Sequence, residues 1–513
     1  MADKILVAYY SKTGHTKAAA QKIAKAAGGA LHEIVSTKEY PASYVATVAV
    51  AKWEQLKNEK PALNDKVQGF EDYNVVLVGF PIWWFTCPQS IKTFMESYDF
   101  TGKTVYPFCT HGGSGPKNST RDIRSICPGA DVKECFEKKG YKFKVVWSEQ
   151  LNQRKCTELD DIFEKEFDEG VDGRAFDCVF TFNYSPVISI NCNKRNVPYI
   201  SIVYDSPQIL LYSYTIINPC NYVFIFDKTQ YMELSNEGIE TVYYCPLAVN
   251  TDRLKSMFND EYEEKNQLYA GDISFIGSMY NEKHNLYDRL CGVNDYTKGY
   301  LDAIMKVQRS IYGYFFLENM LKGDVLDEMM RVCPVKPNED GVETVQYVYA
   351  NYFLARRMAT DERTDILSRV GRELGRENKI NLYTPDASVR FINVNNKGTV
   401  DYYNEMPYVF RNSRINLNIT LRSIKSGIPL RCMDICGAGG FLLSNYQADL
   451  YDVFVPGEDM VIYDSIDDLM NKCKYYLSHD AERRQIAQNG FGKIEEKHTY
   501  DVRFEEIFNR VFN

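Results

Sequence analysis

The sequence predicts an α/β protein in which parallel strands and helices alternate along the chain. Short apolar runs bounded by turn residues are separated by stretches with helical periodicity. This alternation is typical of parallel sheets whose strands are joined by helices. Polar or glycine-rich segments directly follow many of the apolar runs. Because parallel strands end at one edge of a sheet, we expect these segments to form ligand sites there.

Length and composition predict a globular chain of several domains. The 513 residues suffice for three domains, and 45% hydrophobic with 25% charged residues is an ordinary globular composition. The net charge of −9, without a basic tract, argues against a nucleic-acid partner. The sequence begins with a predicted strand and contains no run long enough to span a membrane. Its 14 cysteines form no CxxC pair, so we expect a reduced, cytoplasmic protein.

The first predicted strand, residues 4–10, leads into a hydroxyl-rich loop and then a helix that ends near residue 27. Ser11, Thr13 and Thr16 supply hydroxyl groups, and Gly14 allows the backbone to bend. The helix N-terminus favours an anion, so the loop predicts a phosphate site, although the P-loop spacing is absent. The alternative is an ordinary capped helix.

Two further strands of this domain, residues 74–80 and 104–109, also end in distinctive loops. The first loop reads PIWWF, and consecutive aromatic residues after a strand predict a flat wall for a planar ring. The second reads THGGSG, in which glycines let backbone N–H groups approach a ligand closely. All three loops are expected at one sheet edge.

Together the segments YSKTGHT, GFPIWWFTCP and FCTHGGSG resemble the three flavin-binding loops of the flavodoxin family, over residues 1–138. The resemblance implies a doubly wound sheet, non-covalently bound FMN and a redox partner. His15 stands where that family often has Asn. The implied FMN-binding residues are Ser11, Thr13, Gly14, His15 and Thr16 for the phosphate, and Pro81, Ile82, Trp83, Trp84, Thr110, His111, Gly112 and Gly113 for the ring.

The segment that joins this domain to the next, residues 127–147, contains no linker rich in Gly, Pro or Ser. Flavodoxins normally end in a fifth strand and a closing helix. Either the first domain has lost its last helix, or the second domain has lost its first strand and helix. The sequence leaves both alternatives open.

The second predicted domain, residues 139–265, contains strands at 176–182, 199–204, 222–226 and 242–245. Asp205 directly follows the second of these strands. A carboxylate at a strand end that faces a cleft suits a general base, so Asp205 is our candidate for that role. An Asp that caps the turn before Pro207 is an equally good interpretation.

The third predicted domain, residues 266–513, contains strands at 272–277, 380–383, 415–419 and 440–443. A helical insertion at about 300–377 carries aromatic and leucine stripes that are most simply core. The final helix, near residues 500–511, is expected to pack back across a domain boundary.

A glycine-rich motif, GIPLRCMDICGAGGFLL, occupies residues 427–443. It predicts a helix start that carries Arg431 and Asp434, followed by a bend at Gly437 and Gly439. Helix N-termini and bare backbone N–H groups attract phosphate, and a carboxylate can accept ribose hydroxyls, so the motif suits a nucleoside diphosphate. The alternative is an ordinary helix–strand crossover.

From about residue 140 the chain resembles the CgeB-like glycosyltransferases, through segments such as YDSPQ, DISFIGSMYNEKH and NSRINLNITLRSIKSGIPLRCMDICGAGGFLLSN. The resemblance implies two Rossmann-like domains of GT-B type with a helical insertion, and a nucleotide-sugar donor. Asp434 stands where the wider superfamily has a ribose-binding Glu, and Ser426 stands where it often has a second acid. The other implied donor-binding residues are Gly277, Ser278, Lys283, Arg422, Lys425 and Arg431.

No metal is required in this architecture, because cations and helix N-termini can stabilise the departing diphosphate. Arg431 is our candidate for this catalytic role, whereas surface charge is an even alternative for Arg422 and Lys425. The sequence thus predicts a metal-independent glycosyltransferase with an FMN module, acting on a glycan, protein or small-molecule acceptor. The alternative is an electron-transfer flavoprotein whose larger half binds a nucleotide or glycan without turnover.

Overall fold

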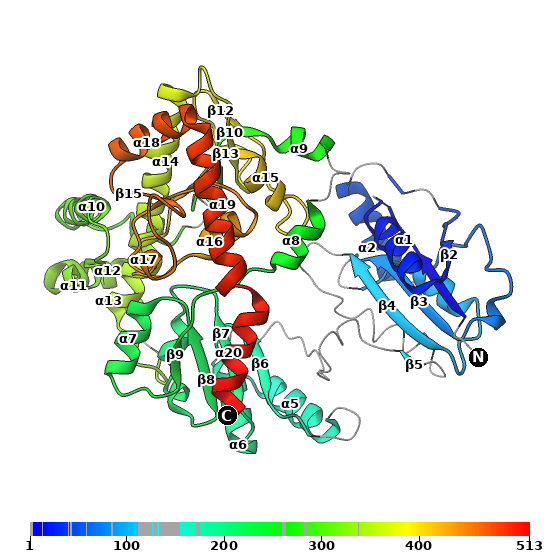
Figure 1. Cartoon of the computed structure of the whole chain (residues 1–513). Helices are drawn as coiled ribbons and strands as arrows, with labels where there is room; N and C mark the ends of the chain where they lie inside the picture. The colour runs from blue at the N-terminus through cyan, green and yellow to red at the C-terminus, as the bar shows by residue number, and fades with distance from the viewer. Residues whose placement is uncertain are drawn as a thin grey trace. The chain divides into compact units, whose positions relative to one another are not determined.

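The computed structural model divides the chain into two compact units, Met1–Trp147 and Ser148–Asn513, which are described separately below (Figure 1). The predicted domain boundary at residues 138/139 and most of the segment at 127–147 lie outside the described residues. The structure describes residues 4–12, 14–38, 40–41, 44–57, 59–83, 86–110, 123, 126–127, 131–132, 154–170, 175–258, 263–281, 285–336 and 338–512.

The first unit is built on a parallel five-stranded sheet in the order β2-β1-β3-β4-β5. This order is that of a flavodoxin-like doubly wound sheet and confirms the predicted fold class. Its strands are β1 (Ile5–Tyr9), β2 (Ala30–Glu33), β3 (Val75–Pro81), β4 (Thr104–Thr110) and β5 (Asp131–Val132). Its helices are α1 (His15–Ala27), α2 (Tyr44–Lys57), α3 (Gln89–Glu96) and the 3₁₀ turn η1 (Phe70–Asp72).

Strand β1 is apolar throughout because it lies inside the sheet, between β2 and β3, and both its faces are covered. Leu6 and Ala8 lie in the larger buried cluster with the apolar side chains of β3. Val7 and Tyr9 point to the opposite face, where they pack against α1. The loop after β1 is therefore anchored from both faces of the sheet.

The second unit begins with a lobe, here called the N-lobe, around a parallel four-stranded sheet in the order β6-β7-β8-β9. These strands are β6 (Val179–Phe182), β7 (Tyr199–Val203), β8 (Asn221–Ile225) and β9 (Val242–Tyr244). The surrounding helices are α5 (Thr157–Glu169), α6 (Pro186–Arg195), α7 (Lys228–Asn236), η3 (Ile209–Tyr212) and η4 (Tyr214–Ile217).

The remaining lobe, here called the C-lobe, contains a parallel six-stranded sheet in the order β12-β11-β10-β13-β14-β15. When β10 is counted as the first strand, the order reads 3-2-1-4-5-6, which is the order of a Rossmann fold. In such sheets, ligands bind where the strand order reverses. That point lies between β10 and β13. The strands are β10 (Gly271–Ile276), β11 (Ile380–Tyr383), β12 (Val394–Asn396), β13 (Ser413–Asn418), β14 (Leu442–Asn445) and β15 (Val461–Tyr463).

Helices surround this sheet and fill the predicted insertion between β10 and β11. The aromatic and leucine stripes of the insertion form a buried cluster of their own, as predicted. The insertion contains η6 (Leu286–Leu290), α10 (Asp295–Arg309), α11 (Leu317–Met320), α12 (Gly323–Val332), α13 (Val345–Val348), the π-helix η7 (Tyr349–Leu354) and α14 (Ala355–Leu374). The other helices are α8 (Thr251–Met257), α9 (Glu263–Tyr269), α15 (Met406–Asn412), α16 (Leu430–Gly437), α17 (Leu450–Val453), α18 (Ile466–Ser478) and α19 (Asp480–Lys497).

The last helix, α20 (Tyr500–Phe512), returns from the C-lobe to the N-lobe and is drawn in red in Figure 1. Ile507 is fully buried against apolar side chains of β7 and β8. The rings of Phe504 and Phe180 meet with centroids 5.7 Å apart. The prediction that the final helix packs back across a domain boundary is confirmed. Within the described residues, no helix combines the length and the apolar character needed to cross a membrane.

Candidate functional site

The loop after β1 in the first unit places polar groups at the start of α1. Gly14 precedes α1 with φ 86°, the left-handed conformation that favours glycine. The hydroxyl oxygen of Ser11 is buried and bonds to no described residue, and Thr16 is buried in the first turn of the helix. This combination suits an anion at the helix N-terminus. Thr13 and the side chain of His15 lie outside the described residues.

The loop after β3 begins at Pro81 and brings Trp83 against two tyrosines that the sequence did not single out. The Trp83 ring lies edge-on to Tyr10 and Tyr40, with centroids 5.6 and 5.0 Å apart. The Tyr40 hydroxyl donates to Oε2 of the buried Glu54 at 2.9 Å, which fixes this group. Burial raises the pKa of both tyrosines far above its usual range. The indole is thereby held rigidly beside β3.

The other ring-binding residues implied by the resemblance are placed only in part. Ile82 packs against the core of the first unit. Thr110 ends β4, but its side chain is not described. Trp84, His111, Gly112 and Gly113 lie outside the described residues.

In the C-lobe, Arg431 and Asp434 lie in the first half of α16, which begins after Pro429. The Tyr402 hydroxyl donates to both carboxylate oxygens of Asp434, at 3.0 and 3.1 Å. Burial raises the pKa of Asp434 to about 6, against the opposing charge of Arg431. Arg431 contacts the sulfur of Met406, and burial lowers its pKa. A cation and a carboxylate therefore share a poorly solvated environment.

This pair faces the N-lobe. Tyr204 follows β7 and Tyr500 begins α20, and their hydroxyl groups lie 2.9 Å apart. Burial raises the pKa of both tyrosines, and the negative charge of Asp434 adds to the shift in each. The predicted donor carboxylate thus lies near the carboxyl edge of the N-lobe sheet, where the two lobes meet.

Asp205 lies at the same edge of the N-lobe and is exposed. Its Oδ2 accepts a hydrogen bond from Nδ2 of Asn183 at 2.8 Å. Asn183 has a left-handed φ of 65°, and its Oδ1 accepts from the backbone N–H groups of Tyr204 and Asp205. From the insertion, the Tyr352 hydroxyl donates to the carbonyl of Pro207 at 3.0 Å. The contact with Asn183 therefore orients the Asp205 carboxylate, which remains exposed to solvent.

The predicted diphosphate loop follows β10. The N–H of Gly277 donates to the carbonyl of Tyr383 at 3.0 Å, which aligns the loop with β11. Oγ of Ser278 accepts from the N–H of Tyr280 at 2.9 Å and so shapes the turn. Lys283 lies outside the described residues.

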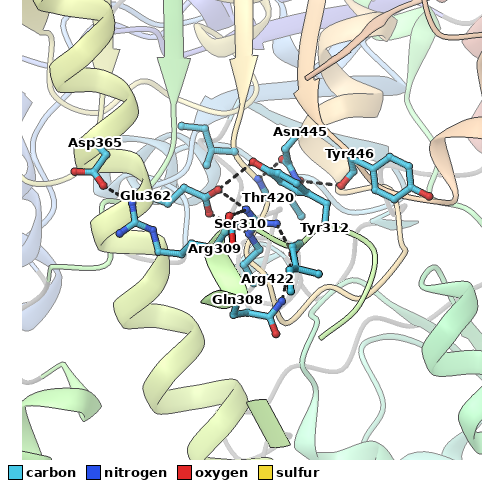
Figure 2. A network of polar contacts seen from close by, with 12 residues as sticks. Gln308, Arg309, Ser310, Tyr312, Glu362, Asp365, Thr420, Arg422, Asn445 and Tyr446 are labelled. Carbon is cyan, nitrogen blue, oxygen red and sulfur yellow. Dashed lines mark hydrogen bonds and ion pairs between the residues drawn. The ribbon is translucent and has the colours of Figure 1, made fainter. Parts of the chain in front are cut away.

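Arg422 is neutralised by a protein carboxylate rather than open to a ligand (Figure 2). It is 7% exposed and bonds both oxygens of Glu362, from Nη2 at 2.6 Å and from Nε at 3.2 Å. Its guanidinium stacks over the Tyr312 ring, 3.7 Å from the centroid. Burial opposes its charge, but Glu362, Tyr312 and Tyr463 together outweigh burial and the pKa of Arg422 is raised. This arrangement favours a structural role.

Lys425 and Ser426 contact the N-lobe. Nζ of Lys425 bonds both oxygens of Glu233 at 2.6 Å. The hydroxyl of Ser426 donates to Asp227 at 3.0 Å and accepts from the N–H of Thr229 at 2.9 Å. Asp227 is fully buried and also accepts from the N–H of Lys425 at 2.7 Å. At the position where the superfamily often has an acid, this chain has a contact between the lobes.

Gly437 and Gly439 lie at the opposite end of α16 from Arg431. A Cβ at Gly437 would come within 2.6 Å of Val249, so this glycine allows close packing. Gly439 follows the helix with φ 74°. Both observations favour structural roles. The described residues include no group of three or more His, Cys, Asp and Glu side chains that could hold a metal.

Two family models match the chain. Residues 4–143 match the flavodoxin family, and residues 353–509 match a glycosyl transferase-like family. The first domain belongs to the flavodoxin family, and the last is a glycosyltransferase-like domain. A putative flavoprotein from Bacteroides eggerthii is 37% identical over 26% of this chain and 86% of its own, with a TM-score of 0.25.

Two further solved structures are similar to the chain, one over its first quarter and one over nearly its whole length. A flavoprotein from Lactobacillus acidophilus, solved with FMN, is 27% identical over 26% of this chain and 91% of its own, with a TM-score of 0.24. Anabaena HepE, solved with UDP, is 10% identical over 99% of both chains, with a TM-score of 0.37.

Sequence reasoning missed several residues of the glycosyltransferase-like half that the structure brings together. Tyr402 and Tyr500 lie beside Asp434 although the loop before α15 and the last helix supply them. Arg363 of α14 donates to the carbonyl of Ser278, 85 positions earlier in the chain. Their side-chain types give no local signal, because only the folded C-lobe gathers them.

Proposed function

We propose that the chain is a metal-independent glycosyltransferase that takes a nucleotide-sugar donor and carries an FMN-binding flavodoxin domain. The observation that carries this proposal is the placement of Arg431 and Asp434 three residues apart on α16, opposite Tyr204 of the N-lobe. A cation beside a carboxylate, where two lobes meet, suits the diphosphate and ribose of such a donor.

Asp434 is proposed to accept the ribose hydroxyls. The Tyr402 hydroxyl already donates to this carboxylate. Two carboxylate oxygens offer about four acceptor positions, so positions remain available for the ribose hydroxyls. The hydroxyl also orients the carboxylate before the donor arrives.

Arg431 and the N-terminus of α16 are proposed to stabilise the departing diphosphate. As the bond between the anomeric carbon and the diphosphate oxygen breaks, negative charge develops on that oxygen. A positioned cation in a poorly solvated site is worth about a hundredfold or more in rate. The acceptor oxygen forms the new bond to the anomeric carbon, and Asp205 takes its proton.

The flavodoxin domain is proposed to hold FMN through its phosphate and its ring. The buried, unpartnered hydroxyl of Ser11, the N–H groups at the start of α1 and Thr16 fit a phosphate. Trp83, which packs against Tyr10 and Tyr40, is proposed to contact the planar flavin ring. When bound, FMN supplies one- or two-electron transfer. A redox partner and a glycan, protein or small-molecule acceptor remain part of the proposal.

We also place the protein in the cytoplasm. The cysteines that the structure describes are all free thiols, and most are buried. A chain rich in unpaired cysteine is typical of a reducing compartment.

The test is a thermal-shift screen of the full chain with nucleoside diphosphates and nucleotide sugars. A ligand at 100 times its Kd stabilises the folded state by about 2.7 kcal/mol, so a nucleotide that binds should clearly raise the Tm. Release of nucleoside diphosphate from the sugar donor then measures turnover. Asp434→Ala should weaken donor binding, while Asp327→Ala, at an exposed position of α12, should not.

Absence of stabilisation by every nucleoside diphosphate would count against the donor. Binding without turnover would favour the alternative of a non-catalytic module beside an electron carrier. A visible flavin spectrum after loading with FMN tests the first domain, and a colourless protein would remove that part of the proposal.

A further inference from the structure

Arg363 occupies the point at which the strand order of the C-lobe sheet reverses. It lies in the middle of α14, and its guanidinium donates to the carbonyls of Ser278 and Ile419, the latter at 2.7 Å. Ser278 follows β10 and Ile419 follows β13, and these two strands pair directly. The positive charge therefore lies at the position where such sheets bind their ligands.

This charge is not matched by a carboxylate. Arg363 is 7% exposed, yet none of the described acidic side chains forms an ion pair with it, and its Nε bonds to no described residue. The neighbouring Glu362 is occupied by Arg422. An unpaired buried charge costs several kcal/mol, so it is unusual without a ligand.

Arg431 adds a second positive charge to the same region. Burial lowers the pKa of Arg363, and repulsion by Arg431 lowers it further. The carboxylate of Asp434 makes the largest favourable contribution to the charge of Arg431. Among the described residues, three guanidinium groups, those of residues 363, 422 and 431, thus share the carboxylates of Glu362 and Asp434.

The loop beside Arg363 is held in a strained shape and packs closely around the guanidinium. Tyr280 has a φ of 53°, which is costly for a residue with a side chain, and its ring centroid lies 4.7 Å from Arg363. Its carbonyl accepts from Thr360 and Asn285 at 2.8 and 2.7 Å. A Cβ at Gly277 would lie 3.7 Å from Nη1 of Arg363. The backbone at Gly277 therefore lies directly beside the charge, with no side chain of its own between them.

We infer that Arg363 is a phosphate-binding residue, which together with Arg431 and the backbone at Gly277 holds the diphosphate of the donor. This inference rests on the proposed function and extends it to a residue from the insertion. A purely structural role, in which Arg363 only joins the loops after β10 and β13, is the alternative that the experiment must separate.

The test is calorimetric titration of the full chain with inorganic pyrophosphate in the presence of saturating FMN, which also fills the phosphate site of the flavodoxin domain. Loss of one charge-assisted contact in a buried site should weaken pyrophosphate binding by about tenfold or more in Arg363→Met. The control is Arg357→Met, an exposed arginine of the same helix, which should bind as the wild type does.

Gly277→Ala provides a second variant if Arg363→Met does not fold. It retains the arginine and adds a methyl group 3.7 Å from its Nη1, where it covers the backbone at residue 277, at the expense of a shift of the Phe275 ring, 3.0 Å from the new Cβ. It should weaken pyrophosphate binding while Arg363 stays in place. Wild-type affinity in either folded variant, or no pyrophosphate binding by the wild type, would overturn the inference.

Failure of the proposed function gives a different result. In that case pyrophosphate still binds in an Arg363-dependent manner, but no nucleoside diphosphate binds more tightly than pyrophosphate does. Conversely, a nucleoside diphosphate that binds wild type and Arg363→Met equally leaves the proposed function standing and removes the role of Arg363.

Discussion

At the scale of single residues, Asp434 has two opposing properties. In its proposed role its carboxylate must be charged to accept strong hydrogen bonds from a ribose, yet burial raises its pKa to about 6. Arg431 favours the charged form but does not restore the usual value. The protonation state of Asp434 therefore changes just below neutral pH, within the range where the protein can be measured.

The first prediction concerns donor affinity and pH. As the pH falls through about 6, Asp434 gains a proton and loses acceptor capacity, so nucleotide-sugar binding should weaken between pH 7 and pH 5. Asp434→Asn should bind more weakly at pH 7 and show little change over this range. Calorimetry with the donor found by screening measures both Kd values.

Tyr402→Phe is the matched control for this prediction. It removes only the hydroxyl that donates to Asp434 and leaves the ring in place. The pH dependence should persist in this variant. If Asp434→Asn kept the wild-type pH dependence, another group would be responsible and Asp434 would be misplaced in the proposal.

The second prediction concerns Asp449, which is 2% exposed and accepts from the N–H of Lys228 across the lobes at 2.9 Å. Burial raises its pKa to about 6, and the nearby charges of Asp227 and Asp452 oppose ionisation further. Because the pKa of Asp449 is higher in the folded than in the unfolded state, Asp449 adds to the free energy of unfolding as the pH falls. This contribution is lost as the pH rises through about 6.

Asp449→Asn should remove this dependence. The Tm of the wild type minus that of Asp449→Asn should rise as the pH is lowered from 7.5 to 4.5, by an amount equivalent to at most about 3 kcal/mol. Differential scanning calorimetry of both proteins over this pH range makes the comparison. A Tm difference that is constant or falls would contradict the pKa assignment.

At the scale of elements, the N-terminus of α7 is capped from both lobes. Asp227 accepts from the N–H of Gln230 within its own helix and from Ser426 of the C-lobe. Ser426 and Asp449 in turn accept from the N–H groups of Thr229 and Lys228. The loop before α16 is thus fixed by the same groups that begin α7.

Ser426→Ala tests this contact and is the third prediction. It leaves the N–H of Thr229 and part of the Asp227 carboxylate unsatisfied in a buried position, at a cost of about 1–3 kcal/mol. The expected result is a lower Tm for the second unit. Ser235→Ala, an exposed serine of α7, should change the Tm little, and an equal loss in both variants would argue against a special role for Ser426.

The fourth prediction concerns α20, whose buried face joins the end of the chain to the N-lobe. Ile507 is fully buried in that contact. Ile507→Ala should lower the stability of the second unit by about 2–5 kcal/mol, because it removes apolar contacts and leaves a cavity. Glu505→Ala, on the exposed face of the same helix, is the control. Chemical denaturation followed by circular dichroism measures both.

The elements that sequence could predict are those with a continuous apolar run. Strands β7, β10 and β11 were expected within one residue of their observed ends, because they are buried on both faces. Strand β12, with the sequence VNN, was not expected, because an edge strand needs no apolar run. The polar strand β2 was missed for the same reason.

The same distinction holds for the candidate site, where residues carried by one local motif could be predicted and residues gathered only by the fold could not. Arg431 and Asp434 were recognisable from a local motif, because one short helix carries both. Arg363, which we infer to belong to the site, was not recognisable, since it is one of several arginines in α14 and only the packed C-lobe shows that it is buried without an ion-pair partner among the described residues. Arg422 was expected to bind diphosphate, but its partner Glu362 is 60 positions away in sequence.

At the scale of the whole molecule, each unit has hydrophobic clusters of its own. The larger cluster of the first unit is formed by β1, β3, β4 and the helices around them. The second unit has a separate cluster in each lobe and one in the insertion. Two units with independent cores are expected to unfold as separate cooperative transitions.

The fifth prediction follows from these separate cores and the two proposed ligands. Calorimetry of the full chain should show two unfolding transitions. FMN at 100 times its Kd should raise only the transition of the first unit, by about 5–10 °C, and the nucleoside diphosphate should raise only the other. Ser11→Ala should reduce the FMN shift, and Asp434→Ala should reduce the nucleotide shift, each without affecting the other. If one ligand raised both transitions, the units would be energetically coupled, and FMN and the nucleotide would then change each other's affinity.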